Sequence, residues 1–206
     1  MRAFIAINLP QEIKDSLETT IKGLDKINRG TKINWTKPEN LHLTLHFLDE
    51  IDENQAQIVS AELEKIAGEY QKIQMSLGSI GAFPDVKNPR VIFIGVQSNH
   101  SRIIEKIQKK IGYELKRLGF KIDLRPYEAH VTLGRVKAGS VKLDLEASAG
   151  KFEVDSIELM KSTLTPSGPI YEVIKSFEFR YVSSPLEGEA RRGLCWSYLT
   201  SPRPSF

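Results

Sequence analysis

Apolar and polar side chains follow two different periods along this chain, and these periods predict its strands and helices. Short apolar or alternating runs are typical of strands, and they occur at 2–9, 32–35, 41–48, 72–83, 90–96, 128–136, 151–162 and 170–182. Apolar residues at every third or fourth position predict helices over 11–27, 53–68 and 101–118. Strands and helices interleave at first and strands dominate the end, which favours a mixed α/β or α+β fold.

The apolar stripes of the three predicted helices indicate which residues face the core. Their members are Ile13, Leu17, Ile21 and Leu24 in the first helix, Ile58, Leu63 and Ile66 in the second, and Ile103, Ile104, Ile107, Ile111, Leu115 and Leu118 in the third. Asp52 is expected to cap the second helix.

Composition narrows the class of protein. The chain has 206 residues, of which 40% are hydrophobic and 27% charged, as is ordinary for one compact globular unit. A net charge of +3 favours anionic ligands only weakly. The single Cys195 excludes a disulfide within the chain and fits a reducing compartment, and no apolar segment reaches the length of about 18 residues that a membrane span requires. We therefore expect a cytoplasmic protein with no membrane association.

The composition and periodicity of the sequence change after Val182. Residues 183–206 are rich in Ser, Pro, Gly and Arg and keep no period. We expect a single domain over 1–182 and a poorly ordered C-terminal extension over 183–206.

One short pattern occurs twice. The sequence HLTL at 42–45 returns as HVTL at 130–133, each time on a predicted strand. Because side chains alternate along a strand, His42 and Thr44 share one face, and His130 and Thr132 share one face of the second strand. The chain therefore looks like two related halves whose strands face a common cleft.

Two imidazoles and two hydroxyls suit phosphodiester chemistry without a metal. A neutral histidine can take a proton from the nucleophile while a protonated one gives a proton to the leaving alkoxide, and both states exist near neutral pH. Thr44 and Thr132 can bind the non-bridging oxygens, and Arg135 can stabilise the growing negative charge. Arg135 has the parity of the inward Leu133, however, so the strand period alone does not direct it to the ligand.

Other residues leave alternatives open. By parity His46 shares the face of His42 and Thr44, and we expect it at the cleft rim or on the surface. A zinc site of His42, His46 and His130 is an alternative, although no acidic or Cys ligand lies at metal-site spacing. Phe83 with Pro84 is an alternative base-stacking platform.

The two motifs, together with RAFIAINLP, NLHLTLHFL, GAFPDVKNPRVIFIGV, AHVTLGR and LMKSTLTPSGPIYEVIKSF, resemble the two-histidine phosphoesterase superfamily, closest to its RNA 2′,3′-cyclic phosphodiesterases, long called 2′-5′ RNA ligases. The resemblance covers about 1–182. It implies an α+β fold of two pseudo-symmetric lobes, with antiparallel sheets facing a central cleft and helices outside.

The resemblance also implies the reaction and the roles. RNA 2′,3′-cyclic phosphate ends would be opened to 2′-phosphates without metal or other cofactor, with His42 as the general acid and His130 as the base. Thr44 and Thr132 would hold the phosphate, and Arg135 matches the family's basic position. Weak reverse ligation of tRNA half-molecules is a further implied activity.

The motifs leave rival functions open. Hydrolysis of a 2′-5′ linkage or of a small cyclic nucleotide uses the same phosphate chemistry, and an RNA-end binding module could keep the cleft without turnover. Lys87, Arg90 and Arg135 are candidates for a local RNA-binding patch. We assume a monomer.

Overall fold

The computed structural model describes residues 1–98, 102–145, 150–166 and 168–180, so the predicted extension over 183–206 lies outside the described residues. Within them the chain forms three α-helices, a short 3-10 helix and nine strands. In chain order these are β1 (Arg2–Asn8), α1 (Gln11–Ile27), β2 (Lys32–Trp35), η1 (Pro38–Asn40), β3 (His42–Glu50), α2 (Glu53–Ala67), β4 (Ile73–Phe83), β5 (Val91–Ser98), α3 (Ile103–Arg117), β6 (His130–Ala138), β7 (Lys151–Val154), β8 (Ser156–Thr165) and β9 (Gly168–Glu178). The strand predicted over 151–162 is thus two strands with a break at Asp155.

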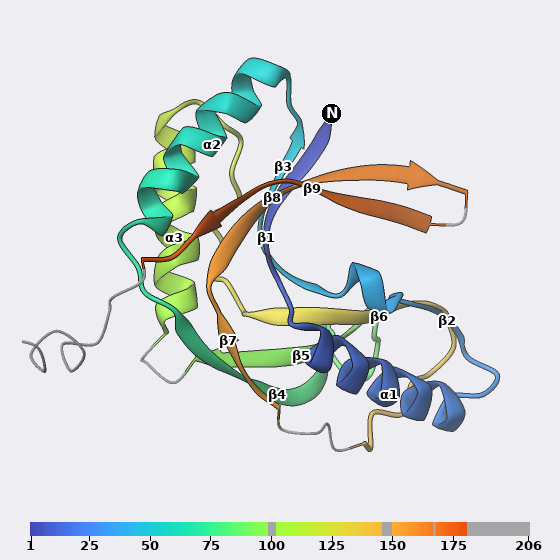
Figure 1. The fold of residues 1–206 in the computed structure, drawn as a ribbon. Coiled ribbons are helices and arrows are strands. Elements are labelled where there is room, and N and C mark those ends of the chain that lie inside the picture. Colours follow the sequence, from blue (N-terminus) through green and yellow to red (C-terminus); the bar gives the residue numbers. More distant parts are fainter. Residues whose placement is uncertain (99–101, 146–149, 167, 181–206) are drawn as a thin grey trace, which may run out of the picture.

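The nine strands form one curled sheet in the order β7-β4-β5-β6-β3-β1-β8-β9, with β2 paired to β6 (Figure 1). All neighbours in this sheet run antiparallel. The α+β class with antiparallel sheets is therefore confirmed.

The sheet divides into two lobes at its narrowest pairing. β3 and β6 are joined by the single residue pair Leu43 and Val131. On one side, lobe 1 contains β3, β1, β8 and β9; on the other, lobe 2 contains β6, β5, β4, β7 and β2. The bilobal arrangement predicted from the sequence is thus present, although the two motif strands lie side by side at the junction rather than across a gap.

The lobes do not coincide with the two halves of the sequence. Lobe 1 combines β1 and β3 with β8 and β9 from the end of the chain, and its helices α2 and α3 pack on each other and on β3, β8 and β9. Helix α1 follows β1 of lobe 1 but lies along lobe 2 (Figure 1), where Ile13 reaches Gly150 and Gly23 lies against Leu145. Each lobe is therefore completed by segments from both halves.

The helix stripes are confirmed in most positions and wrong in two. Ile58 is 45% exposed because it lies five residues before Leu63, on another side of α2; Ala56, Val59, Leu63 and Ile66 form the buried face instead. Leu118 is 44% exposed because α3 ends at Arg117 and the chain turns away. Asp52 caps α2 as expected, since it accepts a hydrogen bond from the Gln55 backbone N–H at 2.8 Å.

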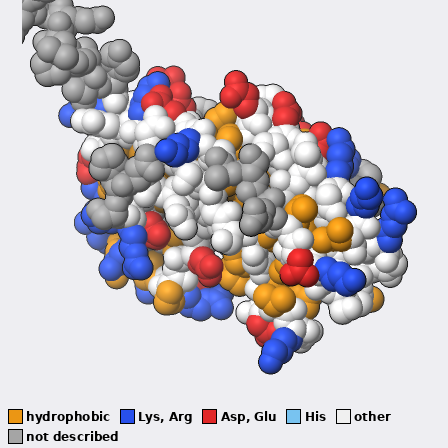
Figure 2. Space-filling view, turned by 90° about the horizontal axis from the view of Figure 1, so that it is seen from below, with side chains coloured by type: hydrophobic (Ala, Val, Ile, Leu, Met, Phe, Trp, Pro, Cys, Tyr) orange, Lys and Arg blue, Asp and Glu red, His pale blue; other side chains and the backbone are white. Residues whose placement is uncertain are grey.

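The outer surface carries charges of both signs. Seen from below the view of Figure 1, Lys and Arg side chains are interspersed with Asp and Glu (Figure 2). This fits the small net charge of +3. In the part of the chain that the structure describes, no helix is long and apolar enough to cross a membrane.

Candidate active site

The junction between the lobes brings the two His-x-Thr motifs together. Because Leu43 and Val131 are antiparallel partners, the residues on either side of them are opposite each other, His42 to Thr132 and Thr44 to His130. Leu43 and Val131 are fully buried, whereas the four motif residues are only partly covered on the other face. Both imidazoles and both hydroxyls therefore lie on one face of the sheet, as the sequence predicted.

A bulge follows each motif at the same place. In β3, Thr44 pairs with Ala6 but His46 pairs with Ile5, so Leu45 is an extra residue in that strand. A β-bulge of this kind reverses the alternation of all later residues in its strand.

The second motif carries the same irregularity. In β6, Thr132 pairs with Phe93 and Gly134 with Ile92, so Leu133 is extra. The burial patterns of β3 and β6 agree over the first six residues, which places His46 and Gly134 inward and Phe47 and Arg135 outward. The two motif strands are therefore equivalent beyond the motifs themselves.

The bulge corrects the prediction for His46. This residue is 4% exposed, and its Nε2–H donates a hydrogen bond to the Gln108 carbonyl of α3 at 2.7 Å. A side chain at Gly112 of α3 would meet the His46 ring at 2.9 Å. His46 therefore packs in the core on the opposite face from His42, so a zinc site of His42, His46 and His130 is wrong.

The bulge at Leu133 in β6 determines the direction of Arg135. Its parity in the sequence is that of Leu133, but the extra residue returns it to the face of His130 and Thr132. Its positive charge lowers the pKa of Tyr171 on β9, against the larger effect of burial, which raises that pKa. Arg135 thus lies near the motif residues, at the position in β6 that corresponds to Phe47 in β3.

Backbone carbonyls orient both imidazoles in the same way. His42 Nδ1–H donates to the Asn40 carbonyl and His130 Nδ1–H to the Glu128 carbonyl, each at 2.7 Å. Nε2 is then the nitrogen available for proton transfer in each ring. The Thr44 hydroxyl lies 2.9 Å from His42 Nε2 and donates to it when the ring is neutral. This arrangement of the two histidines suits acid-base chemistry at Nε2.

Aromatic rings flank each histidine. The His42 ring centroid lies 5.0 Å from that of Phe4 and 5.1 Å from that of Tyr171. His130 lies 5.0 Å from Phe83 and 5.3 Å from Phe93, which stack on each other. Phe83, considered above as an alternative base-stacking platform, is part of the wall around His130. These rings contact the imidazoles on their sides.

A buried lysine and a buried glutamate lie near His42. Lys14 on the first turn of α1 is 8% exposed and interacts with Glu158, which is 4% exposed. The Glu158 carboxylate accepts hydrogen bonds from the backbone N–H of Asn8, at 2.9 Å, and from the hydroxyl of Ser156, at 2.6 Å. Asn8 is the strand partner of His42, so this carboxylate adjoins the site.

Burial controls the protonation of His42. It is the largest cause that lowers the pKa of His42 to about 4, and electrostatic interactions with Lys14 and His130 lower it further. The hydrogen bond to Asn40 acts in the opposite direction but is a smaller effect. His42 is therefore neutral at pH 7 when the site holds no anion.

Tyr127, in the loop between α3 and β6, connects that loop to the first motif. Its phenol donates to the Thr44 carbonyl at 2.8 Å, and burial raises its pKa above the ordinary value. We expect Tyr127→Phe to lower the free energy of unfolding by about 1 kcal/mol, because the carbonyl loses its partner. Urea denaturation measures this; Tyr113→Phe, at an exposed tyrosine of α3, is the matched control and is expected to change little.

A pocket of about 500 Å³ adjoins His130 on lobe 2. Its walls are Gly78, Ser79, Ile80, Gly81, Phe93, Gly95, Val96, Gln97, Arg102, Glu105, Tyr127, Glu128 and Ala129. Phe93 contacts the His130 ring, and the Glu128 carbonyl holds its Nδ1. The pocket is therefore lined by two residues that contact His130, although His130 itself is not part of its wall.

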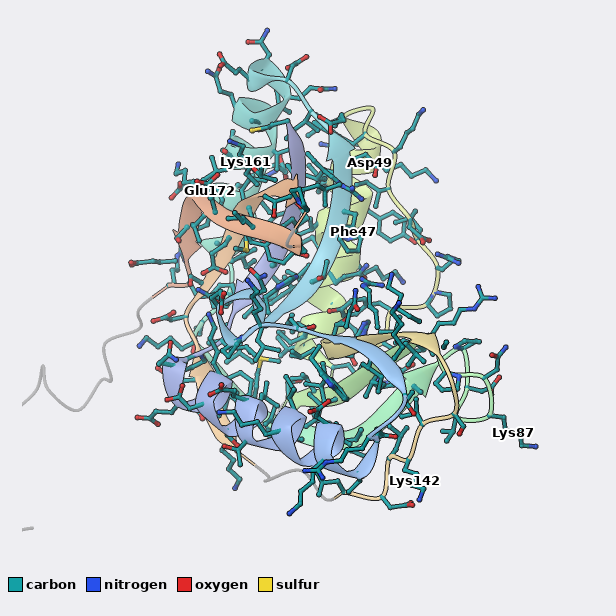
Figure 3. All side chains as sticks on the ribbon, turned by 90° about the vertical axis from the view of Figure 1, so that its right-hand side faces the viewer. Phe47, Asp49, Lys87, Lys142, Lys161 and Glu172 are labelled. Atoms are coloured by element: carbon teal, nitrogen blue, oxygen red, sulfur yellow. The ribbon has the colours of Figure 1, made fainter. Side chains whose placement is uncertain are left out.

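Sequence reasoning missed several residues of this site. Tyr171 and Asn40 gave no signal, because their roles depend on chain segments that meet only in the fold. Lys14 did give one: it lies three residues before Leu17, on the buried side of α1. The predicted RNA contacts Lys87 and Arg90 are exposed, and Lys87 lies at the edge of the molecule in Figure 3.

The side chains that could hold a metal ion are scattered. Across the described parts of the chain, no three His, Cys, Asp or Glu side chains are grouped as metal ligands would be.

The fold and the paired histidines define a class, and comparison with known proteins identifies it. The family model described as LigT-like phosphoesterase matches this chain twice, over residues 7–93 and 94–171. The protein belongs to the LigT-like phosphoesterase family.

Curated relatives cover most of the chain. A protein of Methanocaldococcus jannaschii named RNA 2′,3′-cyclic phosphodiesterase is 38% identical over 191 residues, with 86% of this chain and 100% of the relative covered. One of the same name from Archaeoglobus fulgidus is 34% identical over 184 residues, with the same coverage. The crystal structure of a Thermus thermophilus protein, TT0787, matches with a TM-score of 0.78 and 26% identity, covering 87% of this chain and 98% of that one.

Proposed function

We propose that this protein is an RNA 2′,3′-cyclic phosphodiesterase, which opens the cyclic phosphate at an RNA 3′ end to a 2′-phosphomonoester. The observation that carries the proposal is the pairing of two imidazoles on one sheet face, each with Nδ1 bound to a backbone carbonyl; Nε2 of His42 is held by the Thr44 hydroxyl. The names of relatives that cover most of the chain support the choice of substrate.

In the proposed reaction His130 Nε2 takes a proton from water, which attacks phosphorus. His42 Nε2–H gives a proton to the leaving 3′-oxygen on the opposite side. The P–O bond to water forms as the P–O3′ bond breaks, and the 2′-phosphate remains. Thr44 and Thr132 bind the non-bridging oxygens, and Arg135 stabilises their added negative charge.

The roles require His42 to gain a proton when substrate binds. In the free protein its pKa is about 4, so the ring is neutral at pH 7. A phosphate anion beside the imidazole favours the charged form and offsets the positive charge of Lys14. We therefore expect proton uptake to accompany binding of the anion.

This protonation can be measured by NMR. We expect the His42 ring signals to titrate near pH 4 in the free protein and at least one pH unit higher with adenosine 2′-phosphate bound. Lys14→Met should also raise the pKa of His42, by less, because burial and not Lys14 is the largest cause of its lowering. A His42 pKa that stays near 4 with the nucleotide bound would reverse the assigned roles.

The direct test is hydrolysis of a short RNA that ends in a 2′,3′-cyclic phosphate, with EDTA present. We expect a 2′-phosphate product, formed at the same rate as in the absence of EDTA. A 3′-phosphate product would contradict the geometry of attack, and loss of turnover in EDTA would indicate a metal-dependent reaction. Turnover only with 2′-5′-linked RNA or a small cyclic nucleotide would support those rival substrates, and binding without turnover would support an RNA-end binding module.

We propose that a single bilobal domain within 1–182 acts as a cytoplasmic monomer, since one chain supplies both histidines. Ends of tRNA fragments are proposed substrates, and slow reverse ligation is a proposed side activity.

A further inference from the structure

Phe47 is a large apolar side chain exposed on the face of the sheet that carries the two histidines. It is 62% exposed, although β3 has buried positions on both sides of it. The bulge at Leu45 turns it outward, as the bulge at Leu133 turns Arg135 outward. Equivalent bulges thus expose an aromatic ring in lobe 1 and a cation in lobe 2.

Phe47 continues an apolar strip that begins at His42. Its ring centroid lies 6.2 Å from that of Phe4, which contacts both His42 and Tyr171 at 5.0 Å. Met160 is buried against Phe4 in the same cluster. Figure 3 shows Phe47 on β3 and the neighbouring β8–β9 hairpin with Lys161 and Glu172. A single exposed apolar residue needs no explanation, but Phe47 extends a cluster of aromatic rings that reaches His42, the proposed general acid.

Cations lie at the edge of this strip. The guanidinium groups of Arg2 and Arg135 are both close enough to Tyr171 to lower the pKa of its phenol, against the larger raising effect of burial. Arg2 precedes Phe4 on the same face of β1, because side chains alternate along the strand. Aromatic rings next to cations suit the base and the phosphates of a single-stranded nucleic acid.

The in-line geometry of the proposed reaction places the nucleoside over lobe 1. In an in-line displacement the leaving 3′-oxygen is opposite the attacking water, so the ribose lies on the side of the acid. With His42 as the acid, the ribose and its base extend over lobe 1, and the pocket beside His130 is left for water. This step rests on the proposed function.

We propose that Phe47 is the stacking surface for the base of the terminal nucleotide. The base lies on the exposed ring, with its ribose directed toward His42 and Tyr171. Stacking on an aromatic ring tolerates every base, so the site binds RNA ends with little sequence preference.

The affinities of the Phe47→Ala variant for a nucleotide and for inorganic phosphate distinguish contacts to the base from contacts to the phosphate. We expect the Kd of adenosine 2′-phosphate, by calorimetry, to rise about tenfold or more, and the Kd of inorganic phosphate to stay within about twofold. Phe47→Trp should keep the affinity for the nucleotide. Ile58→Ala, at a 45% exposed apolar residue on α2, is the matched control and should change neither Kd.

Two results would overturn the proposal. If Phe47→Ala leaves nucleotide affinity unchanged while Gln97→Ala weakens it, the nucleoside binds in the pocket beside His130. If Phe47→Ala weakens phosphate and nucleotide equally, its role is to hold the site together and not to stack a base. Because these are binding measurements, they give an answer even if the wild-type protein hydrolyses no cyclic phosphate, which would refute the proposed function separately.

Discussion

Replacing His130 by alanine is expected to lower kcat for cyclic phosphate hydrolysis by about 10²- to 10⁴-fold, the range for loss of a general base. Binding of the substrate should change little, because Thr44, Thr132 and Arg135 remain. His42→Ala should cause a loss of similar size by removing the acid. The measurement is single-turnover hydrolysis at saturating enzyme, which separates chemistry from binding.

The third histidine of the described chain supplies the control. His46 is on the same strand as His42 but donates to the Gln108 carbonyl on the other face. His46→Gln keeps a donor there and should retain kcat within a few-fold, whatever it costs in stability. If His130→Ala kept most of the wild-type kcat, the acid-base mechanism would be wrong and a water activated elsewhere would have to be sought.

Leu43→Ala is expected to lower the free energy of unfolding by about 2–5 kcal/mol, as do other leucine truncations in well-packed cores. Leu43 is fully buried, and with Val131 it forms the one residue pair that joins β3 to β6. The cavity would therefore open where the two lobes meet. Denaturation by urea, followed by circular dichroism, gives the change.

The matching control is another leucine on a strand. Leu164 on β8 is 67% exposed, so Leu164→Ala should change the free energy of unfolding by no more than about 0.5 kcal/mol. Equal effects of the two substitutions would mean that the junction is not a packed part of the core.

The elements and the motif faces were predictable because they depend on local periods. The stripes of α1 and α3 and the alternation in 42–45 and 130–133 involve neighbours within a few residues. The same alternation failed at His46 and Arg135, since the bulged residue in each strand is a leucine and not a Gly or Pro that would mark it. The sequence could not show it because bulges are defined by the pairing strand.

Long-range contacts account for the remaining differences. Glu158 and Tyr171 come from the last strands of the described chain and reach β1 and β3 near its start. No local pattern predicts that a carboxylate of β8 interacts electrostatically with a lysine of α1. The roles of His42, His130, Thr44, Thr132 and Arg135 stay predictions until variants are measured.

The exchange of segments between lobes has a consequence for how the chain could be divided. The family model repeats at residue 94, yet a cut there would leave β1 and β3 without β8, and α1 without the loop that carries Leu145. Neither fragment, 1–93 or 94–206, would contain a complete hydrophobic core. We therefore expect each to be unfolded alone and to regain structure only when mixed with the other. In this molecule the unit of sequence repetition is smaller than the unit of folding.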